Sequence, residues 1–511
     1  MRNITKIHHV AARELIAHSP QNGEPARTRV ENANHACYDS SVSKKAHFIG
    51  IAGKGMSAVA LLLREAGYEI SGSDEGFYPP VSDYLERAHI EFAHGYKKEN
   101  IPADADLIVI GKNAKLVAQS NEEVKAAFDS GIPIKSFPDI LEELSKDKET
   151  LVVAGSYGKS TCTALLSWCL MHAGKDPSYF VGEITKGFDA HAKLGKGETF
   201  ILEGDEYPSA NWDERSKFLH YNPKNVLLTS ATHDHVNVYP THEDYLKPFR
   251  QLIGIIPTEG VLVVNDEPFA RQLAEGFGGT RVEYGLAESN EWHAASIAYG
   301  LPTSFDLMHK GTKVVTLTTK LLGAHNIENI VGISAMLLTK HLLTPEELAT
   351  GVASFEGVKR RMELLSPNST VPVLEGFGSS LEKAKSAIAG MRLHFPARRL
   401  VVVFEPHTFT WRNRDAIAQY DHAFDGADRV YIYEPATQGA HTHAQLSQDE
   451  IIERVRATGM TVDPIQTVEE GLRRILDEAS ENDAILLLTS GDLGGLIKSI
   501  PEEIEKHFPL A

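Results

Sequence analysis

The 511-residue chain has little cysteine and no long apolar segment. Its three cysteines, Cys37, Cys162 and Cys169, include no CxxC pair. This argues against a disulfide framework or a cysteine zinc site and favours a reducing compartment. The densest apolar runs, such as Ala484–Leu488, have the length of a strand and fall far short of the roughly 18 residues of a membrane span. We therefore expect a cytoplasmic protein without a membrane partner.

Positive charge is also in short supply. Asp and Glu number 69 against 51 Lys and Arg, so the formal net charge is −18. So acidic a surface repels phosphate backbones and argues against general nucleic-acid binding. An anionic substrate must instead be held by a local cluster of amides and cations. Hydrophobic residues make up 42% of the chain, a globular balance that excludes global disorder.

Residues 1–44 lack the continuous apolar stretch of a secretory signal. We expect them to be a poorly ordered extension, or the product of a start placed too early. At roughly 150 residues per domain, the remainder suggests about three domains. The expected divisions are 45–149, 150–365 and 366–511.

Short apolar runs alternate with segments of helical period, which predicts an α/β chain with largely parallel sheets. A unit of Rossmann character opens the chain, and the charged stretch Glu142–Glu149 is interpreted as a linker to the second unit. The expected strands are 47–51, 69–71, 107–110, 132–134, 151–154, 200–202, 226–229, 400–404, 429–433 and 484–488, and the expected helices are 57–66, 163–173, 451–457 and 468–479.

The strongest local motif runs from Leu151 to Thr161. An apolar strand leads into Gly155-Ser156-Tyr157-Gly158, and Lys159-Ser160-Thr161 then opens a helix. Glycines allow backbone N–H groups to surround phosphate oxygens, and the lysine neutralises their charge, so this pattern predicts a phosphate-binding loop with Ser160 as a magnesium ligand. The full GxxxxGK[ST] pattern is not met, because Val153 stands at its first glycine. A glycine turn followed by a solvated lysine is the alternative.

Acidic and imidazole groups follow two further strands. Glu203 ends the strand 200–202, and His235 follows the strand 226–229. The carboxyl ends of neighbouring parallel strands meet at one edge of a sheet, so we expect both near the phosphate loop as second and third contacts to a magnesium ion or its waters. Each of them alone fits an ordinary surface loop equally well.

Several segments together resemble the Mur ligase family, the ATP-dependent amide ligases that build the peptide stem of the bacterial cell wall. The resemblance spans about residues 45–500 and implies a Rossmann-like first domain, a P-loop ATPase-like central domain and a Rossmann-like third domain. It is carried by the segments His47–Ser57, Gly72–Asp74, Ala154–Thr161, Gly323–Asn329, Gly357–Arg361 and Glu405–His407.

The resemblance implies roles for individual residues. The first domain would bind a UDP-sugar, the central domain ATP, and the third domain an amino acid or peptide acceptor. The implied UDP-sugar contacts are Gly53, Gly55, Met56, Ser57, Ser73 and Asp74; the implied ATP contacts are Gly155, Ser156, Tyr157, Gly158, Lys159, Ser160, Thr161, His325, Asn326, Asn329 and Arg361; and the implied acceptor contacts are His407 and Arg412.

The residues alone leave simpler interpretations open. The Gly50–Gly55 turn also suits close packing of a helix on a strand, and His325-Asn326 also suits a helix cap. His407 is equally compatible with a structural histidine. Arg215 and Lys217 would orient the sugar carboxylate or form surface ion pairs.

Lys159, Glu203 and His235 are the expected catalytic centre, with Ser160, Glu203 and His235 around Mg²⁺. The implied reaction activates the carboxylate of UDP-N-acetylmuramate with ATP as an acyl phosphate, which the amine of a peptide then attacks. Within the family, the chain most resembles the recycling branch, which uses a tripeptide. The alternatives are L-alanine or another acceptor, and a nucleotide-binding homologue without turnover. We expect a monomer or weak dimer.

The chain departs from the family pattern in three places. Where the family commonly has Asp-Asp-(Phe/Tyr)-Ala-His-His-Pro, this chain has Glu375-Gly376, and Ser379-Ser380 replace the histidines. Ser230 and Thr232 stand where Asn and Glu are frequent. The phosphate loop carries Ser156-Tyr157 in place of Thr-His.

Overall fold

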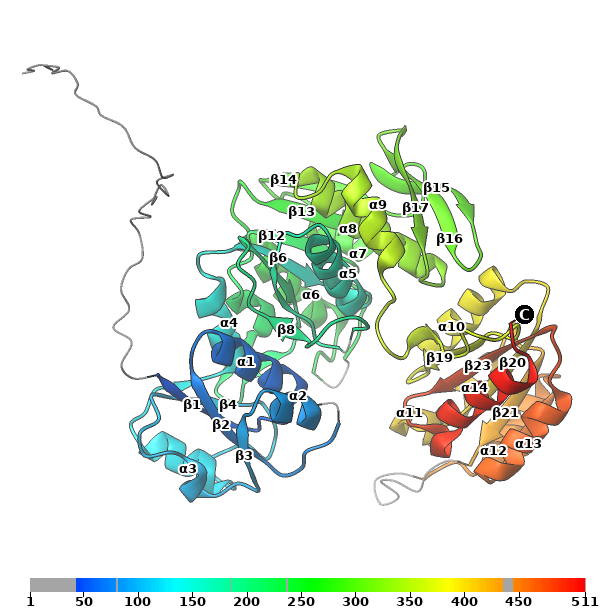
Figure 1. The fold of residues 1–511 in the computed structure, drawn as a ribbon, viewed down its shortest axis with the longest axis horizontal. Coiled ribbons are helices and arrows are strands. Elements are labelled where there is room, and N and C mark those ends of the chain that lie inside the picture. Colours follow the sequence, from blue (N-terminus) through cyan, green and yellow to red (C-terminus); the bar gives the residue numbers. More distant parts are fainter. Residues whose placement is uncertain (1–42, 80, 184, 236–237, 435–443, 511) are drawn as a thin grey trace, which may run out of the picture. The chain divides into compact units, whose positions relative to one another are not determined.

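The computed structural model describes residues 43–79, 81–183, 185–235, 238–434 and 444–510. Apart from residues 43 and 44, the expected N-terminal extension lies outside this part of the chain. Residues 44–511 form a single unit. Its described strands make three large sheets, in chain order, and one two-stranded hairpin (Figure 1).

The first sheet has five parallel strands in the order β3-β2-β1-β4-β5. All four residues of β4, Leu-Ile-Val-Ile, are buried, as expected for a parallel strand covered on both faces. The elements are β1 (Lys45–Ile49), α1 (Lys54–Glu65), β2 (Glu69–Asp74), α2 (Val81–Arg87), β3 (Glu91–His94), η1 (Lys98–Asn100), β4 (Leu107–Ile110), α3 (Glu122–Asp129), β5 (Ile134–Lys135) and α4 (Phe137–Ser145).

The predicted linker over Glu142–Glu149 is wrong in its first half, because α4 continues to Ser145. A capping box starts this helix: Ser136 and Asp139 each accept a hydrogen bond from the other's backbone N–H. Ile140 and Leu141 bury the apolar face, and the acidic residues of the stretch lie on the outer face. Charge on an exposed helix face was mistaken for a linker.

The second sheet has ten strands in the order β17-β16-β15-β14-β13-β12-β6-β9-β7-β8. Its middle is parallel, as predicted, but β15–β17 form an antiparallel meander that the sequence analysis missed. The strands are β6 (Glu149–Ala154), β7 (Ser178–Phe180), β8 (Ala192–Lys193), β9 (Thr199–Glu203), β12 (Asn225–Leu228), β13 (Val261–Asn265), β14 (Thr280–Tyr284), β15 (Trp292–Ala298), β16 (Thr303–His309) and β17 (Thr312–Thr319), and the hairpin is β10 (Pro208–Ala210) and β11 (Asp213–Ser216).

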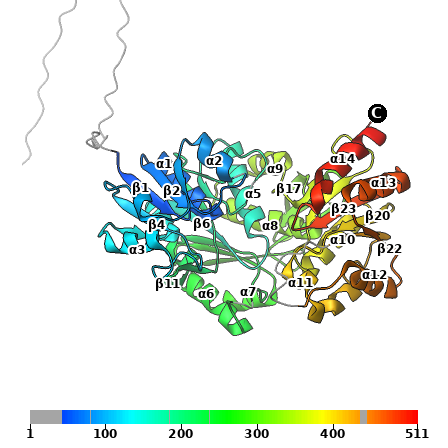
Figure 2. The same ribbon diagram turned by 90° about the horizontal axis from the view of Figure 1, so that it is seen from below.

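Helices cover both faces of this sheet. Alternate residues of β6 point to opposite faces: Val152 packs in the core that contains residues of α6, and Val153 in the core that contains residues of α5 and α8. Figure 2 shows α6 and α7 on the other side of the sheet from α5 and α8. The helices are α5 (Lys159–His172), η2 (Lys217–His220), α6 (His242–Gly254), α7 (Pro268–Leu273), α8 (Ala324–Thr339) and α9 (Pro345–Ser354).

The strand order brings three loops to one edge of the sheet. β6 lies between β9 and β12 and is parallel to both. The loops that follow these three strands therefore leave the sheet at the same edge.

The third sheet has the order β18-β19-β23-β20-β21-β22 and is parallel except for β18. The predicted strands 400–404, 429–433 and 484–488 are confirmed as β20, β21 and β23. The elements are β18 (Arg361–Leu364), β19 (Val373–Phe377), α10 (Leu381–His394), β20 (Arg399–Phe404), α11 (Phe409–Arg412), η3 (Arg414–Asp421), β21 (Arg429–Tyr433), α12 (Gln448–Ala457), β22 (Val462–Ile465), α13 (Val468–Glu478), β23 (Asp483–Thr489), η4 (Leu493–Gly495) and α14 (Leu496–His507).

None of the helices in the described part of the chain combines the length and the apolar character that crossing a bilayer requires.

Candidate active site

The predicted phosphate loop is the connection between β6 and α5. Gly155 and Gly158 have φ values of 137° and 83°, a backbone region that favours glycine. A Cβ on Gly155 would lie 2.3 Å from Thr229 Oγ1, and one on Gly158 would lie 2.6 Å from Asn329 Oδ1. Both glycines are therefore required by conformation and by space. No side chain caps α5, so the N–H groups of its first turn are left for a ligand.

Two of the three departures from the family pattern contact each other. Ser156 Oγ donates a hydrogen bond to the carbonyl of Thr232 over 2.5 Å, and the backbone N–H of Tyr157 donates to Ser230 Oγ over 3.1 Å. The altered phosphate loop thus packs on the altered loop after β12. The residues at these two departures are therefore hydrogen-bonded to one another.

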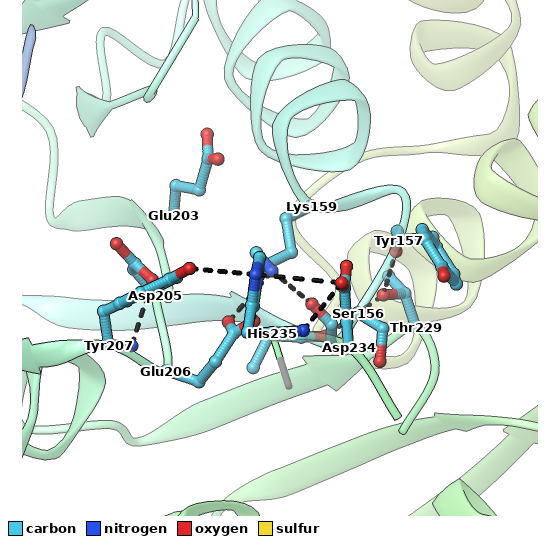
Figure 3. Close-up of polar contacts among 12 residues, drawn as sticks. Ser156, Tyr157, Lys159, Glu203, Asp205, Glu206, Tyr207, Thr229, Asp234 and His235 are labelled. Atoms are coloured by element: carbon cyan, nitrogen blue, oxygen red, sulfur yellow. Dashed lines mark hydrogen bonds and ion pairs between the residues drawn. The ribbon is translucent and has the colours of Figure 1, made fainter. Parts of the chain in front are cut away.

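Lys159 points to a carboxylate that the sequence analysis did not select (Figure 3). Its Nζ lies 3.0 Å from Glu206 Oε2 and also donates to the carbonyl of Gly155. Glu206 is fully buried, and Tyr245 donates its hydroxyl proton to Oε1 over 3.2 Å. Glu206 lies three residues after Glu203, the last residue of β9, so its position after a strand was a usable signal.

Glu206 also holds His235. Nε2 of His235 lies 3.2 Å from Glu206 Oε1, and Nδ1 lies 2.9 Å from the hydroxyl of Tyr207. Burial acts to raise the pKa of Glu206, but the charge of Lys159 and the hydrogen bond with His235 outweigh it and lower the pKa to about 2. The hydrogen bond to Glu206 in turn raises the pKa of His235 above its ordinary value.

The predicted metal ligands are brought together only in part. Ser160 Oγ donates to Glu203 Oε1 over 2.7 Å, and Glu203 Oε2 accepts from the backbone N–H of Gly182 over 2.7 Å. Burial raises the pKa of Glu203. His235 instead makes its described contacts with Glu206, Tyr207 and Asp234. A hydroxyl and a carboxylate at a helix N-terminus are the oxygen ligands that Mg²⁺ prefers.

The second turn of α8 reaches the phosphate loop. Asn329 contacts the Gly158 region, and its amide donates to Asn326 Oδ1 over 3.2 Å. Asn326 donates to the carbonyl of Leu322, and His325 is exposed. The alternative that His325 and Asn326 form a cap is wrong, because the N-cap residue is Gly323 and no side chain caps it.

The predicted UDP-sugar residues lie around the start of α1 and the end of β2. Gly53 precedes α1, and Ser57 and Ser73 are fully buried. Ser57 Oγ donates to the carbonyl of Lys54, and Ser73 Oγ donates to Glu123. Asp74 accepts from the backbone N–H of Ala52.

The side chains of Ser57, Ser73 and Asp74 therefore form hydrogen bonds with other groups of the protein in and around the turn between β1 and α1. Met56 is buried and Gly55 is half-buried. A Cβ on Gly55 would lie 3.2 Å from the ring of Phe137.

The remaining predicted residues lie in the third domain or at the hairpin β10–β11. Arg361 is exposed at the start of β18. His407 Nδ1 lies 3.3 Å from Glu405 Oε1, and the Arg412 side chain is buried in α11. Arg215 and Lys217, beside the hairpin, form ion pairs with Asp213 and Asp205 respectively.

Glu375 and Gly376, neighbours on β19, face different surroundings. Glu375 is buried and lies 2.7 Å from Arg360 Nε. A Cβ on Gly376 would lie 3.2 to 3.3 Å from Leu486, Ala387 and Leu488. An acid at residue 376 would therefore have to enter the packed core of this sheet.

A glycine loop between a strand and a helix, with a lysine and a hydroxyl–carboxylate pair beside it, defines a nucleotide-dependent enzyme. Comparison with known proteins gives the same class. Residues 45–149 match the catalytic domain of the Mur ligase family, residues 153–337 the Mur ligase middle domain, and residues 360–491 the glutamate ligase domain of Mur ligases.

The chain belongs to the Mur ligase family and is an ATP-dependent ligase that forms carbon–nitrogen bonds. It is 28% identical over 468 residues, 91% of this chain and 99% of the relative, to the UDP-N-acetylmuramate–L-alanyl-γ-D-glutamyl-meso-2,6-diaminoheptandioate ligase of Escherichia coli K12.

Among the solved structures that are similar to this chain are two Mur ligases. The corresponding ligase of Neisseria meningitides is 30% identical, with a TM-score of 0.57, over 62% of this chain and all of that one. The UDP-N-acetylmuramate–alanine ligase of Thermotoga maritima shares the fold at 22% identity, with a TM-score of 0.71, over 91% of this chain and 99% of that one.

Proposed function

We propose that this enzyme joins the tripeptide L-alanyl-γ-D-glutamyl-meso-diaminopimelate to UDP-N-acetylmuramate in peptidoglycan recycling, as a monomer or weak dimer. The observation that carries the proposal is the similarity over 91% of the chain to the Escherichia coli ligase named for that peptide. The phosphate loop, with Lys159 and the Ser160–Glu203 pair, supports the ATP-dependent part of the reaction.

The proposed chemistry has two steps. The lactyl carboxylate of the sugar attacks the γ-phosphorus of ATP, the bond to the β,γ-bridging oxygen breaks, and ADP leaves an acyl phosphate behind. The α-amine of the peptide then attacks the acyl carbon, releases phosphate and gives up a proton. Neither step needs a covalent bond to the protein, so catalysis consists of positioning and charge stabilisation.

Lys159 and the amides of the loop carry most of that stabilisation in this proposal. The Lys159 ammonium exchanges its contact with Glu206 for one with the phosphates, which would leave Glu206 paired with His235 and Tyr245. Ser160 and Glu203 would hold Mg²⁺, and His235 would contact its water. When bound, Mg²⁺ neutralises developing charge on the phosphate oxygens.

Two features of the sequence favour other candidates for the acceptor or the activity. Pro406-His407 resembles the alanine-adding branch of the family, and this favours L-alanine as the second candidate. Gly376, in place of an acid of the family pattern, favours a homologue without turnover as the third.

One assay separates the three candidates. The protein is incubated with ATP, Mg²⁺ and UDP-N-acetylmuramate, with tripeptide or L-alanine added in turn, while ADP and product mass are followed. We expect tripeptide-dependent ADP formation with a coupled product. A coupled product with L-alanine only would establish the second candidate, and ATP binding without turnover would establish the third.

A further inference from the structure

His220, at the end of η2, is a buried imidazole surrounded by carboxylates. Its exposed fraction is 2%, and within the described part of the chain neither ring nitrogen has a hydrogen-bond partner. Nδ1 lies 3.2 Å from Asp139 Oδ1 and 3.4 Å from Glu142 Oε2. Nε2 lies 3.3 Å from Asp213 Oδ2. Buried polar groups are nearly always hydrogen-bonded, so this arrangement requires an explanation.

Two of the carboxylates come from one face of α4. Asp139 and Glu142 are three residues apart, which places them side by side on a helix. Asp139 Oδ2 accepts from the backbone N–H of Ser136 over 2.8 Å, so its other oxygen is left for His220. The Glu142 side chain is about half exposed, and the group is therefore open to solvent on that side.

Hydrogen bonds from side chains to backbone carbonyls join α4 to the residues that follow η2. Asn222 Nδ2 donates to the carbonyl of Glu142 over 3.0 Å, and Ser145 Oγ donates to the carbonyl of Tyr221 over 3.4 Å. The three side chains are therefore presented to each other by anchored segments, and one ligand atom of each lies within 4.8 Å of the others.

The spacing fits a metal ion better than hydrogen bonds. Zinc binds histidine nitrogen at about 2.0–2.1 Å and carboxylate oxygen at about 2.0–2.2 Å, which puts two ligands of a tetrahedral site about 3.4 Å apart. The distances from Nδ1 to the two oxygens, 3.2 and 3.4 Å, match that separation. Because neither oxygen accepts a hydrogen bond from Nδ1, an ion between the three atoms would satisfy all of them at once.

A third carboxylate, Asp213, lies beside Nε2, the His220 nitrogen that faces away from Asp139 and Glu142. Histidine ligands commonly offer their second nitrogen to a carboxylate, which fixes the tautomer and leaves the other nitrogen free for the metal. Asp213 Oδ2 lies beside Nε2, and Arg215 holds Asp213 with N–O distances of 3.1 and 2.7 Å. With a bound ion, Nε2 would donate to Asp213 Oδ2, 3.3 Å away, and Nδ1, the nitrogen that faces Asp139 and Glu142, would be the ligand.

We propose that Asp139, Glu142 and His220 bind a divalent first-row transition metal such as Zn²⁺, with water as a further ligand. Imidazole with carboxylates favours such an ion over Mg²⁺. None of the three residues makes a described contact with the phosphate loop, and an ion held by them would join α4 to η2. Its role is therefore structural.

The test is a Zn²⁺ titration of the full, chelator-treated protein in excess Mg²⁺, which fills oxygen-only sites. We expect one tight Zn²⁺ per chain. Glu142→Gln changes a half-exposed side chain and should weaken that binding at least about tenfold. His220→Asn should remove it. The matched control is His422→Asn, because His422 is an exposed histidine 3.0 Å from Asp425.

Cobalt gives a second readout. Co²⁺ in the site should produce visible absorption bands in the wild type and in His422→Asn, and much weaker bands in Glu142→Gln. Zn²⁺ should also raise the melting temperature of the wild type more than that of Glu142→Gln. Equal Zn²⁺ affinity in the wild type and Glu142→Gln, or no tight Zn²⁺ in the wild type, would overturn the proposal.

Discussion

The Lys159 ammonium lies 3.0 Å from the carboxylate of Glu206. Both side chains are largely buried, and the side chain of His235 contacts the other oxygen of the same carboxylate. Glu206 therefore balances the charge of the phosphate-loop lysine and keeps it at the loop. A buried lysine without such a partner would tend to lose its proton.

Replacement of Lys159 by alanine should abolish most activity. The variant removes the cation expected at the phosphates, and loss of one such group typically lowers turnover by roughly 100- to 1,000-fold. Steady-state ADP release with saturating ATP measures the effect. Lys193→Ala is the matched control, because Lys193 pairs with Asp176 on the surface and should leave the rate unchanged. Equal rates for Lys159→Ala and the wild type would contradict the assignment of the loop.

Replacement of Glu206 by glutamine should lower the pKa of His235. The hydrogen bond that His235 donates to the Glu206 carboxylate is the main cause that raises the pKa of His235 above 6.5. A raised histidine pKa adds stability that is fully present below pH 6.5 and is lost as the pH rises through the raised value. NMR titration of the imidazole measures the shift, with the exposed Glu214→Gln as control. An unchanged His235 pKa in Glu206→Gln would contradict the pairing.

Replacement of Gly158 by alanine should disrupt the phosphate loop. The new Cβ would be placed 2.6 Å from Asn329 Oδ1 in a backbone conformation with φ of 83°. The positive φ alone costs a residue with a Cβ about 1–2 kcal/mol, and the clash adds to it. Gly174→Ala is the matched control, since its φ is 71° and nothing lies within 4 Å. ATP affinity by calorimetry should fall in Gly158→Ala and persist in Gly174→Ala; equal loss in both would reject the steric argument.

The Gly376→Asp variant restores the aspartate that the family commonly has at this place. It should reduce the stability of the folded protein without improving ATP binding. Its Cβ would lie 3.2 to 3.3 Å from three apolar side chains, and burial of an unpaired carboxylate costs several kcal/mol. Thermal unfolding should show a lower melting temperature than Gly278→Asp, where the nearest atom is 3.9 Å away. A Gly376→Asp variant as stable as the wild type, with tighter ATP binding, would contradict this interpretation.

Much of the fold was predictable because its strands are short apolar runs between helical segments. The predicted strands 107–110 and 429–433 match β4 and β21. The meander β15–β17 escaped because its strands are only partly buried and differ from the apolar parallel strands: β16 alternates buried and half-buried residues, and most of β17 is exposed or half-buried. Helix α4 was missed in part because acidic residues on its exposed face concealed its apolar face.

The sequence predicts the backbone of the candidate site better than it predicts which side chains contact each other there. The strand–glycine–helix pattern identified the phosphate loop, and strand order explains why Glu203 lies beside Ser160. Three acidic residues lie within four positions at the end of β9, and their sequence does not indicate which one is turned inward. Glu206 is selected by burial against Tyr245, from a helix about 40 residues further along the chain, and such long-range packing has no local signal.

The most direct measurement is a crystal structure of the protein with Mg²⁺ and a non-hydrolysable ATP analogue. The account predicts that the β- and γ-phosphates contact the amides of residues 155–160 and the Lys159 ammonium, and that Mg²⁺ lies about 2.1 Å from Ser160 Oγ. Triphosphate bound elsewhere, with Lys159 still paired to Glu206 and the loop empty, would contradict it.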